Sequence, residues 1–158
     1  MINCEFENKN KANLRHVTVD ALVLNERGDK LLLEKRAEHL LLHGGKWCLP
    51  GGFLNRDETM VEGMKREIKE ETGYDAKELK LFRINDKPDR KGEDRQNVTF
   101  VFLATASEKT GVRDDEAQQT RWFRFDQMPS EKEFAFDHHE NVQLLIKYRE
   151  ERFNLPMK

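Results

Sequence analysis

Three glutamates near the middle of the chain are the residues whose types and spacing could do chemistry. Glu67, Glu70 and Glu71 lie in a segment with the pattern of a helix. At about 100° per residue, Glu67 and Glu71 share one helix face and Glu70 lies beside them. Crowded carboxylates repel one another, and a hard divalent cation with oxygen ligands relieves that repulsion. A solvent-exposed acidic face is the alternative interpretation of the same residues.

The residues around these glutamates extend the pattern. From Gly52 the chain has five residues, then Glu58, then seven residues, and then Arg-Glu-Ile-Lys-Glu-Glu-Thr-Gly-Tyr over 66–74. This arrangement resembles the signature of the Nudix hydrolase family, G-x5-E-x7-R-E-U-x-E-E-x-G-U, where U is a bulky apolar residue. Every fixed position matches, and Tyr74 stands where an aliphatic residue is more usual. The segment Trp-Cys-Leu-Pro-Gly-Gly over 47–52 also resembles the family's approach to this signature.

The resemblance implies a fold of the α+β class, the Nudix fold, which is an α/β/α sandwich with a mixed β-sheet. It also implies hydrolysis of a nucleoside diphosphate linked to another group, with Mg²⁺ as the cofactor and Mn²⁺ as a substitute. By position in the signature, the implied metal ligands are the carbonyl of Gly51 and the carboxylates of Glu67, Glu70 and Glu71. The implied catalytic residues are Arg66, Glu70 and Glu116, and the implied supports of the loop and helix are Gly52, Glu58 and Gly73.

The implied mechanism follows from the negative charge of a diphosphate, which resists attack by water. Metal ions neutralise that charge, orient the linkage and lower the pKa of a bound water. A carboxylate within reach then accepts the proton. In several members this base precedes a late strand, where Glu116 lies here, although an ordinary acidic loop residue explains Glu116 equally well. Arg66 is expected to orient the glutamates more than to contact substrate.

Residues outside the signature carry the expectation about the substrate. Pro88 lies fifteen residues after Gly73, as in members that hydrolyse ADP-ribose, and no tyrosine occupies 89–91, near where members that cut dinucleoside polyphosphates carry one. The segment Phe-Ala-Phe-Asp-His over 134–138 resembles a segment of bacterial ADP-ribose pyrophosphatase-like members. Its alternative interpretation is structural, with Phe134 and Phe136 in the core and Asp137 in a capping box. We therefore expect ADP-ribose or a related nucleotide sugar.

Arginine and aromatic residues outside the signature are candidate substrate contacts. Arg36 ends a predicted strand that leads to the signature, and an arginine can bind phosphate oxygens in a bidentate way. Arg90 and Arg95 are further candidates for phosphate, while Phe53 and Trp47 are candidates for stacking on a base. For the arginines the alternative is a solvent-exposed charge, and Trp47 is better explained as a core residue.

Two other functions stay open. A nucleoside triphosphate pyrophosphohydrolase that removes oxidised nucleotides would carry the same signature. A nucleotide-sensing module that binds its ligand without cutting it belongs to a different class. The complete set of signature carboxylates argues against this second alternative.

Composition sets the broader class. The chain has 158 residues, of which 37% are charged, yet its net charge is only −2. This balance gives no support for binding to nucleic acid or membrane, so the expected partner is a small molecule. Cys4 and Cys48 form no zinc or disulfide pattern, and the first residues lack a signal-peptide pattern. We expect one domain over 1–158 in the cytoplasm, and a homodimer stays open.

Hydrophobic patterns predict the elements that must position these residues. Strands are predicted over 16–24, 30–36, 79–84, 98–104 and 121–125, and the first two should form a hairpin around the turn at 25–29. A short extended piece is expected at 47–49, followed by a break at the two glycines 51–52. Helices are predicted over 59–72 and 138–152. This order of elements favours an α+β or layered α/β/α domain with a mixed sheet.

Overall fold

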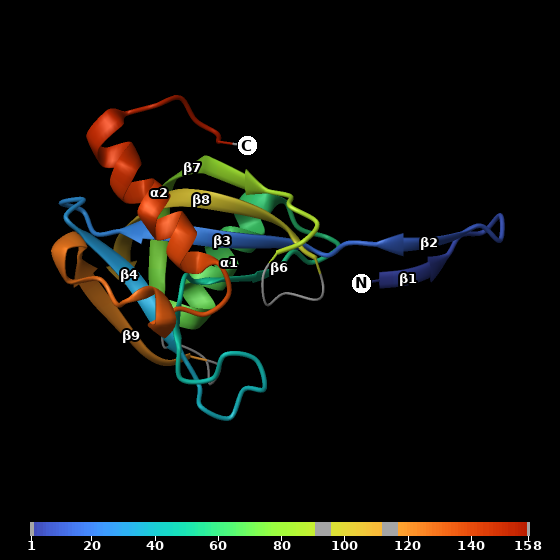
Figure 1. Cartoon of the computed structure of the whole chain (residues 1–158), viewed down its shortest axis with the longest axis horizontal. Coiled ribbons are helices and arrows are strands. Elements are labelled where there is room, and N and C mark those ends of the chain that lie inside the picture. The colour runs from blue at the N-terminus through green and yellow to red at the C-terminus, as the bar shows by residue number, and fades with distance from the viewer. Residues whose placement is uncertain (1, 91–95, 112–116, 158) are drawn as a thin grey trace.

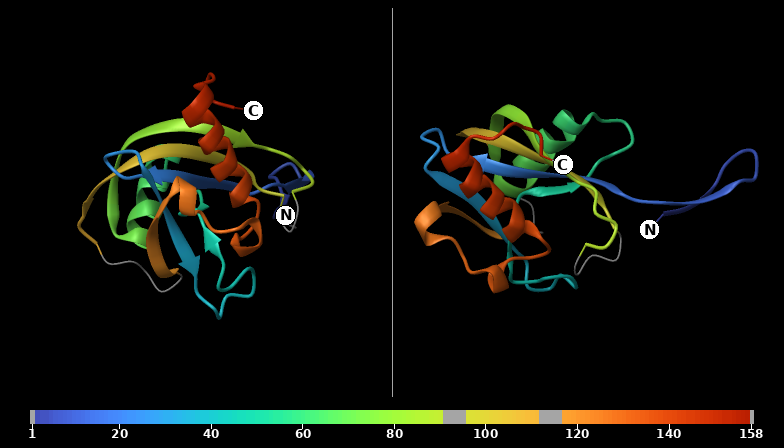
Figure 2. Two further views of the ribbon diagram at one scale, coloured as in Figure 1. Left: turned by 60° about the vertical axis from the view of Figure 1, so that its left-hand side comes forward. Right: turned by 45° about the horizontal axis from the view of Figure 1, so that its top comes forward.

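A mixed β-sheet with a helix on each side forms the body of the protein (Figure 1 and Figure 2). The computed structural model describes residues 2–90, 96–111 and 117–157. Within these ranges the sheet order is β5-β4-β3-β8-β7, with β6 paired to β3 and β9 paired to β4. The strands of this sheet are β3 (Val17–Leu24), β4 (Lys30–Arg36), β5 (Trp47–Cys48), β6 (Gly51–Phe53), β7 (Tyr74–Asn85), β8 (Val98–Lys109) and β9 (Ala117–Arg124). The helices are α1 (Met60–Thr72), α2 (His138–Glu151) and the short 3-10 helices Phe125–Gln127 and Glu131–Glu133.

The alternation of side chains along β3 divides the core into two layers. Val19, Ala21 and Val23 pack in one cluster with Met64 and Ile68 of α1. Leu22 points the other way and packs in a second cluster, to which α2 contributes Val142 and Leu145. Because successive side chains of a strand face opposite sides of the sheet, one buried strand serves both helices. The predicted α/β/α sandwich of the α+β class with a mixed sheet is therefore confirmed.

β3 and β4 pair over only a short stretch. Their antiparallel register joins Val23 to Leu32 and Leu24 to Leu31. Beyond these pairs, Glu34 and Lys35 of β4 pair with β5, and β6 pairs with the first half of β3 from Thr18 to Asp20. β9 pairs with β4 from Lys30 to Arg36. The predicted hairpin is thus confirmed at its turn, and the two strands diverge away from it. The predicted break at the two glycines 51–52 is wrong, because both lie in β6.

α1 begins and ends where the sequence predicts. Thr59 is its N-cap, and the side chains and backbone amides of Thr59 and Glu62 bond reciprocally in a capping box. Gly73 ends the helix with φ of 75°, a left-handed conformation that glycine adopts without steric cost. Both ends of the acidic segment are therefore held locally, which sets the orientation of its glutamates.

The predicted capping box at α2 is wrong. Asp137 precedes the helix, but its side chain makes no capping hydrogen bond. Its carboxylate instead accepts bonds from Arg90 and Asn85. A bidentate, charge-assisted pair with a buried arginine is stronger than a bond to a helix amide, so the tertiary contact prevails.

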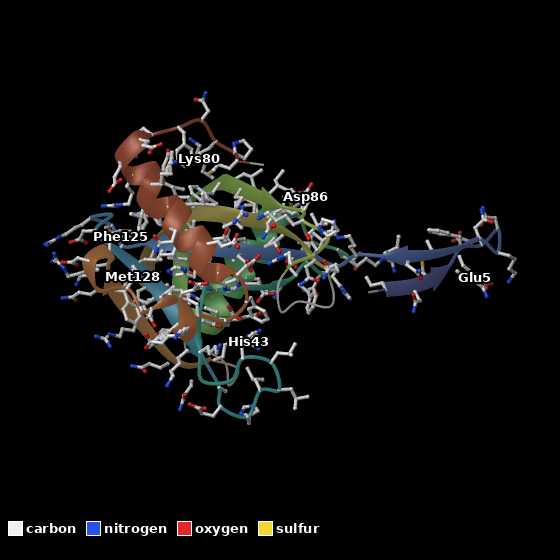
Figure 3. All side chains as sticks on the ribbon, in the orientation of Figure 1. Glu5, His43, Lys80, Asp86, Phe125 and Met128 are labelled. Atoms are coloured by element: carbon white, nitrogen blue, oxygen red, sulfur yellow. The ribbon has the colours of Figure 1, made fainter. Side chains whose placement is uncertain are left out.

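A hairpin that the sequence did not predict projects from the body at the N-terminus (Figure 1). β1 (Ile2–Glu5) pairs with β2 (Lys11–Leu14), and Glu5 lies near the far end of this hairpin (Figure 3). The register sets Ile2 against Leu14, so apolar residues share one face while polar residues such as Glu5 share the other. Four-residue strands in a mostly polar segment are too short to give a clear alternating pattern.

The remaining predicted strands lie within longer observed ones. The segments 79–84 and 98–104 fall inside β7 and β8, which extend to Tyr74 and Lys109, and 121–125 overlaps the end of β9. Throughout the described ranges, none of the helices has the length and apolar character needed to span a membrane.

Gly73 and Gly28 offer a matched test of how the end of α1 is built. Both have positive φ, but a Cβ at Gly73 would collide with the carbonyl oxygen of Gly111, whereas a Cβ at Gly28 meets nothing within 4 Å. We expect Gly28→Ala to lower the free energy of unfolding by about 1 kcal/mol, and Gly73→Ala to lower it by roughly 2–4 kcal/mol because the backbone must also move. Urea denaturation measures both. Equal losses would contradict the packing at Gly73.

Candidate active site

A cavity of about 720 Å³ lies between the acidic face of α1, the first half of β3 and the end of β4. The diverging strands make room for it, since Thr18 and Asp20 line it from β3, and Glu34 and Arg36 line it from β4. The structure places these predicted site residues in its wall: Arg36, Gly51, Gly52, Phe53, Arg66, Glu67, Glu70, Glu71 and Arg90. Glu116 and Arg95 lie outside the described residues.

Arg66 is the centre of the charge network on α1. Its guanidinium donates two hydrogen bonds to Glu58, at 2.7 and 3.0 Å. Its Nη1 donates at 2.8 Å to Glu67 and at 3.0 Å to Glu70. The bonds from Arg66 lower the pKa of Glu58 to about 2, so Glu58 stays ionised and ties the loop before α1 to the helix. Arg66 therefore links three carboxylates, those of Glu58, Glu67 and Glu70.

The two glycines of β6 allow its backbone to approach these carboxylates closely. A Cβ at Gly52 would lie 2.5 Å from Oε1 of Glu67. The backbone amide of Gly51 donates at 2.7 Å to Oε2 of Glu71. A side chain at residue 52 would therefore displace the carboxylate of Glu67, and the Gly51 amide bonds directly to that of Glu71.

Glu67 carries the clearest electrostatic strain in this group. Burial raises its pKa, the bond from Arg66 opposes that rise, and the charges of Glu70 and Glu58 add to it. A buried carboxylate beside like charges needs a compensating positive charge. In this arrangement Arg66 Nη1 supplies it from between Glu67 and Glu70.

The residues present fit a hard divalent cation by their chemistry. Carboxylate and carbonyl oxygens are the ligands that Mg²⁺ prefers, and four such candidate groups line one cavity. Among the described residues, no three acidic, histidine or cysteine side chains already converge closely enough to hold a metal ion. The side chains of Glu67 and Glu70 are engaged with Arg66, so they would have to turn toward the cation.

The opposite wall contains a carboxylate that sequence reasoning missed. Glu34 on β4 is 3% exposed, and the thiol of Cys48 donates to its Oε1 at 2.9 Å. Cys48 is itself buried, with 2% of its surface exposed. Burial, followed by the charges of Glu34 and Glu71, raises the pKa of this thiol well above its usual value. Cys48 is therefore a protonated donor and not a nucleophile. A charged residue directly after three leucines was the available signal for Glu34.

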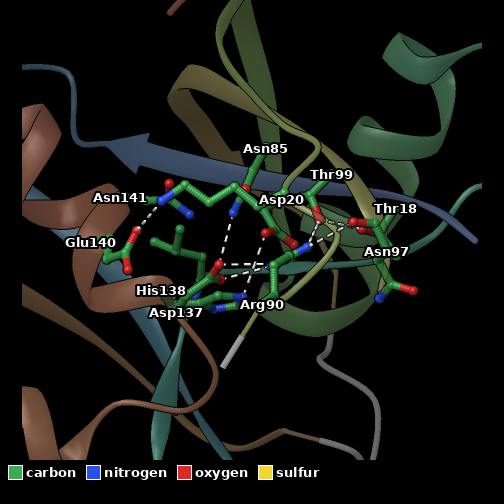
Figure 4. A network of polar contacts seen from close by, with 12 residues as sticks. Thr18, Asp20, Asn85, Arg90, Asn97, Thr99, Asp137, His138, Glu140 and Asn141 are labelled. Carbon is green, nitrogen blue, oxygen red and sulfur yellow. Dashed lines mark hydrogen bonds and ion pairs between the residues drawn. The ribbon is translucent and has the colours of Figure 1, made fainter. Parts of the chain in front are cut away.

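Arg90 lies in the cavity wall, but its hydrogen-bond donors are bound within the protein. Its Nε and Nη2 donate to Asp137 at 2.9 and 2.7 Å, and its Nη1 donates to Thr99 at 2.6 Å (Figure 4). Its side chain is only 4% exposed. The pairing with Asp137 makes Arg90 a structural part of the wall, and its role as a phosphate contact stays a prediction.

The other predicted substrate contacts differ in their surroundings. Arg36 donates to the carbonyl of Leu42 and lies over the ring of Phe136, with its guanidinium carbon 5.2 Å from the ring centroid. Phe136 lines the cavity and is not a core residue, in contrast to the structural interpretation of its segment. Phe53 is 42% exposed at the cavity wall. Trp47 packs against the core, as expected.

His138 is the second wall residue that sequence reasoning did not assign. It is buried at the start of α2, where its Nδ1 accepts a hydrogen bond from the backbone amide of Leu49 at 2.9 Å. Its Nε2 lies 3.5 Å from Oδ2 of Asp20. Burial lowers the pKa of His138 to about 4, so the ring is neutral near neutral pH. An acceptor at Nδ1 requires that the proton be on Nε2.

Comparison with known proteins places this site in a family. A model described as the NUDIX domain matches residues 14–145. The chain belongs to the Nudix family. An ADP-ribose pyrophosphatase of Methanocaldococcus jannaschii is 32% identical over 134 residues, which are 84% of this chain and 74% of that protein. The "8-oxo-dGDP phosphatase NUDT18" of Danio rerio is 28% identical over 109 residues, which are 66% of this chain but only 31% of that protein.

The fold of this Nudix chain agrees with a solved structure. The crystal structure of a NUDIX hydrolase from Nitrosomonas europaea superposes with a TM-score of 0.72 at 24% identity, covering 99% of this chain and 93% of that one. At that identity the likeness shows the fold alone. The family match and the named relatives make this chain a Nudix pyrophosphohydrolase, and Nudix hydrolases generally use divalent metal ions.

The buried neutral His138 predicts an acid-sensitive stability. Its pKa falls from 6.5 to about 4 on folding, so the unfolded chain binds the extra proton between these values. The stability from His138 should be complete above pH 6.5 and should decrease as the pH falls toward 4, by about 3 kcal/mol in total. Urea unfolding as a function of pH measures this. His138→Asn should show a flatter profile, and an unchanged profile would contradict the burial of a neutral ring.

Proposed function

We propose that this Nudix hydrolase cleaves the diphosphate linkage of a nucleoside diphosphate derivative, with ADP-ribose or a related nucleotide sugar as the substrate. The observation that carries the proposal is the gathering of Gly51, Glu67, Glu70 and Glu71 around one cavity. A relative named ADP-ribose pyrophosphatase, 32% identical to this chain, supports the choice of substrate. The products are a nucleoside monophosphate and a sugar phosphate.

The size and lining of the cavity support a ligand with two chemically different ends. About 720 Å³ lies within the range of cavities that bind small molecules and cofactors. One wall carries the carboxylates of α1, which suit a cation-bound diphosphate. Phe136 and Phe53 also line the cavity, and their rings give an apolar surface for a base or sugar.

In the proposed mechanism, Glu67, Glu70, Glu71 and the Gly51 carbonyl hold Mg²⁺, which Mn²⁺ can replace. Bound metal supplies charge neutralisation of the diphosphate and acidifies water. Arg66 keeps Glu67 and Glu70 oriented through its shared Nη1. The Gly51 amide fixes Glu71, and Gly52 leaves space for Glu67. Glu58 and Gly73 support the loop and helix from outside the cavity wall.

The attacking water forms a bond to phosphorus, and the bridging oxygen leaves with the sugar phosphate. Glu70 is assigned to orient this water, because its side chain is 49% exposed while that of Glu67 is 12% exposed. A carboxylate accepts the proton of the water. Glu116 stays a prediction as an alternative base, since it lies outside the described residues.

Replacement of a proposed metal ligand tests the site. Glu71→Gln removes the charge but keeps an oxygen that can accept the bond from the Gly51 amide. We expect the melting temperature to change little and kcat to fall by roughly a hundredfold to a thousandfold or more. The exposed Glu150→Gln on α2 is the control for the same chemical change. A fully active Glu71→Gln enzyme would refute the assignment of Glu71.

A substrate panel tests the proposed substrate against its rivals. It contains ADP-ribose, other nucleotide sugars, dinucleoside polyphosphates, and normal and oxidised nucleoside di- and triphosphates, each with Mg²⁺ and with Mn²⁺. We expect the highest kcat/KM for ADP-ribose or another nucleotide sugar. Oxidised nucleotides are the main rival substrates, because one relative is named 8-oxo-dGDP phosphatase. A preference for them would overturn the proposed substrate. Tight binding of ADP-ribose without turnover would instead favour a nucleotide-sensing module.

Four further expectations accompany this proposal. The partner is a small-molecule nucleotide derivative and neither nucleic acid nor membrane. The cytoplasmic location, the single domain over 1–158 and the homodimer stay predictions. The family match begins at residue 14, after most of the N-terminal hairpin, so this hairpin lies almost entirely outside the matched domain.

A further inference from the structure

Leu49, Pro50 and Gly51, which precede α1 in the chain, each form a hydrogen bond with a different element. The amide of Leu49 donates to His138 at the start of α2 at 2.9 Å. The carbonyl of Pro50 accepts from the amide of Ala21 on β3, also at 2.9 Å. The amide of Gly51 donates to Glu71 on α1 at 2.7 Å. The segment from Leu49 to Gly51 is therefore fixed from both helices and from the central strand.

Of the three partners His138, Ala21 and Glu71, only His138 bonds through a side chain that lies outside the signature. The ring of His138 meets Leu49 through Nδ1, and its Nε2 side faces Asp20 at 3.5 Å (Figure 4). Asp20 lies directly opposite Gly51 in the register of β3 and β6, and a Cβ at Gly51 would be 2.6 Å from Oδ1 of Asp20. His138 therefore contacts Leu49 directly and lies beside Asp20, the β3 residue that pairs with Gly51.

The neighbour of His138 holds the start of α2 in place. Asp137 forms a bidentate pair with Arg90, at 2.7 and 2.9 Å, and accepts a third bond from Asn85 at 2.8 Å (Figure 4). Arg90 is in turn bonded to Thr99 on β8. A buried, charge-assisted pair has little freedom to move. The Asp137 anchor thus limits where the imidazole of His138 can lie relative to the sheet.

We propose that His138 is a positioning residue for the segment from Leu49 to Gly51. Its acceptor at Nδ1 sets the path of the chain through this segment. This inference rests on the proposed function, because it concerns the placement of the Gly51 carbonyl and the Glu71 carboxylate toward a divalent cation. His138 touches neither substrate nor cation, and it acts through the backbone.

The energetic reason is the cost of an unpaired buried amide. Leu49 is 1% exposed, so loss of its acceptor leaves an N–H group without access to water. An unpaired buried N–H group is unfavourable, and the segment would shift to recover a partner. A shift at Leu49 is passed to Gly51 two residues later, and with it to the bond between Gly51 and Glu71. Changes to groups that position metal ligands typically cost about 10–100-fold in metal affinity or activity.

Two substitutions of similar size separate the acceptor from other properties of the ring. The amide oxygen of Asn can lie near the position of Nδ1, whereas the longer Gln places its amide nearer to Nε2. We expect His138→Gln to weaken Mn²⁺ binding by roughly 10–100-fold and to lower kcat with little change in KM. His138→Asn should stay within about threefold of the wild type. The adjacent His139→Gln is the matched control, since His139 does not line the cavity.

Mn²⁺ affinity is measured by electron paramagnetic resonance, and hydrogen exchange of the Leu49 amide follows the bond itself. The exchange rate should rise in His138→Gln and not in His139→Gln. In the wild type, NMR should detect a coupling across the hydrogen bond between the Leu49 amide nitrogen and Nδ1 of His138. This measurement does not depend on how well any variant folds, and absence of the coupling in a well-resolved spectrum would overturn the proposal.

The outcomes separate this inference from the proposed function. Wild-type protein that binds no Mn²⁺ would overturn the proposed metal site and with it the role of His138. Wild-type binding that is unchanged in a folded His138→Gln variant, or reduced equally in His139→Gln, would overturn the positioning role alone. Loss in His138→Gln together with retention in His138→Asn supports it.

Discussion

The concentration of negative charge on one face of α1 is the constraint on which the rest of the site depends. Arg66 bonds directly to Glu58, Glu67 and Glu70, and Glu71 lines the same cavity. One positive charge cannot balance this set. Burial raises the pKa of Glu67, and the charges of Glu70 and Glu58 add to that rise. The excess negative charge makes the site suited to a divalent cation and, through that cation, to an anionic substrate.

The sheet supplies the space that this charge needs. Had β3 and β4 remained paired along their lengths, no cavity would separate Asp20 from Glu34. Instead β4, which pairs with β9 from Lys30 to Arg36, leaves β3 after two residue pairs and pairs with β5. β6 then pairs with the first half of β3. The same divergence brings the glycines of β6 over α1. Strand pairing and the placement of the carboxylates are thus two consequences of one topology.

Sequence reasoning succeeded where the determinants are local. Residues 52–74 form one loop and one helix, so spacing alone places Glu67, Glu70 and Glu71 together and identifies Gly73 as the end of the helix. It failed where a side chain had competing partners. Asp137 has the spacing of a helix cap, but a buried arginine 47 residues away binds it instead. The pairing of Arg90 with Asp137 could likewise not be identified from the sequence.

The sequence by itself determined the family, the class of fold and which carboxylates share one face of α1, because these depend on spacing along a single helix and its loop. Only the tertiary structure decided which residues form the remaining walls. Glu34 meets Cys48 across neighbouring strands, and His138 reaches Leu49 across 89 residues. Such contacts depend on how the helices pack against the sheet. The acidic face of α1 is thus determined locally, while the loop that completes it is held in place by α2.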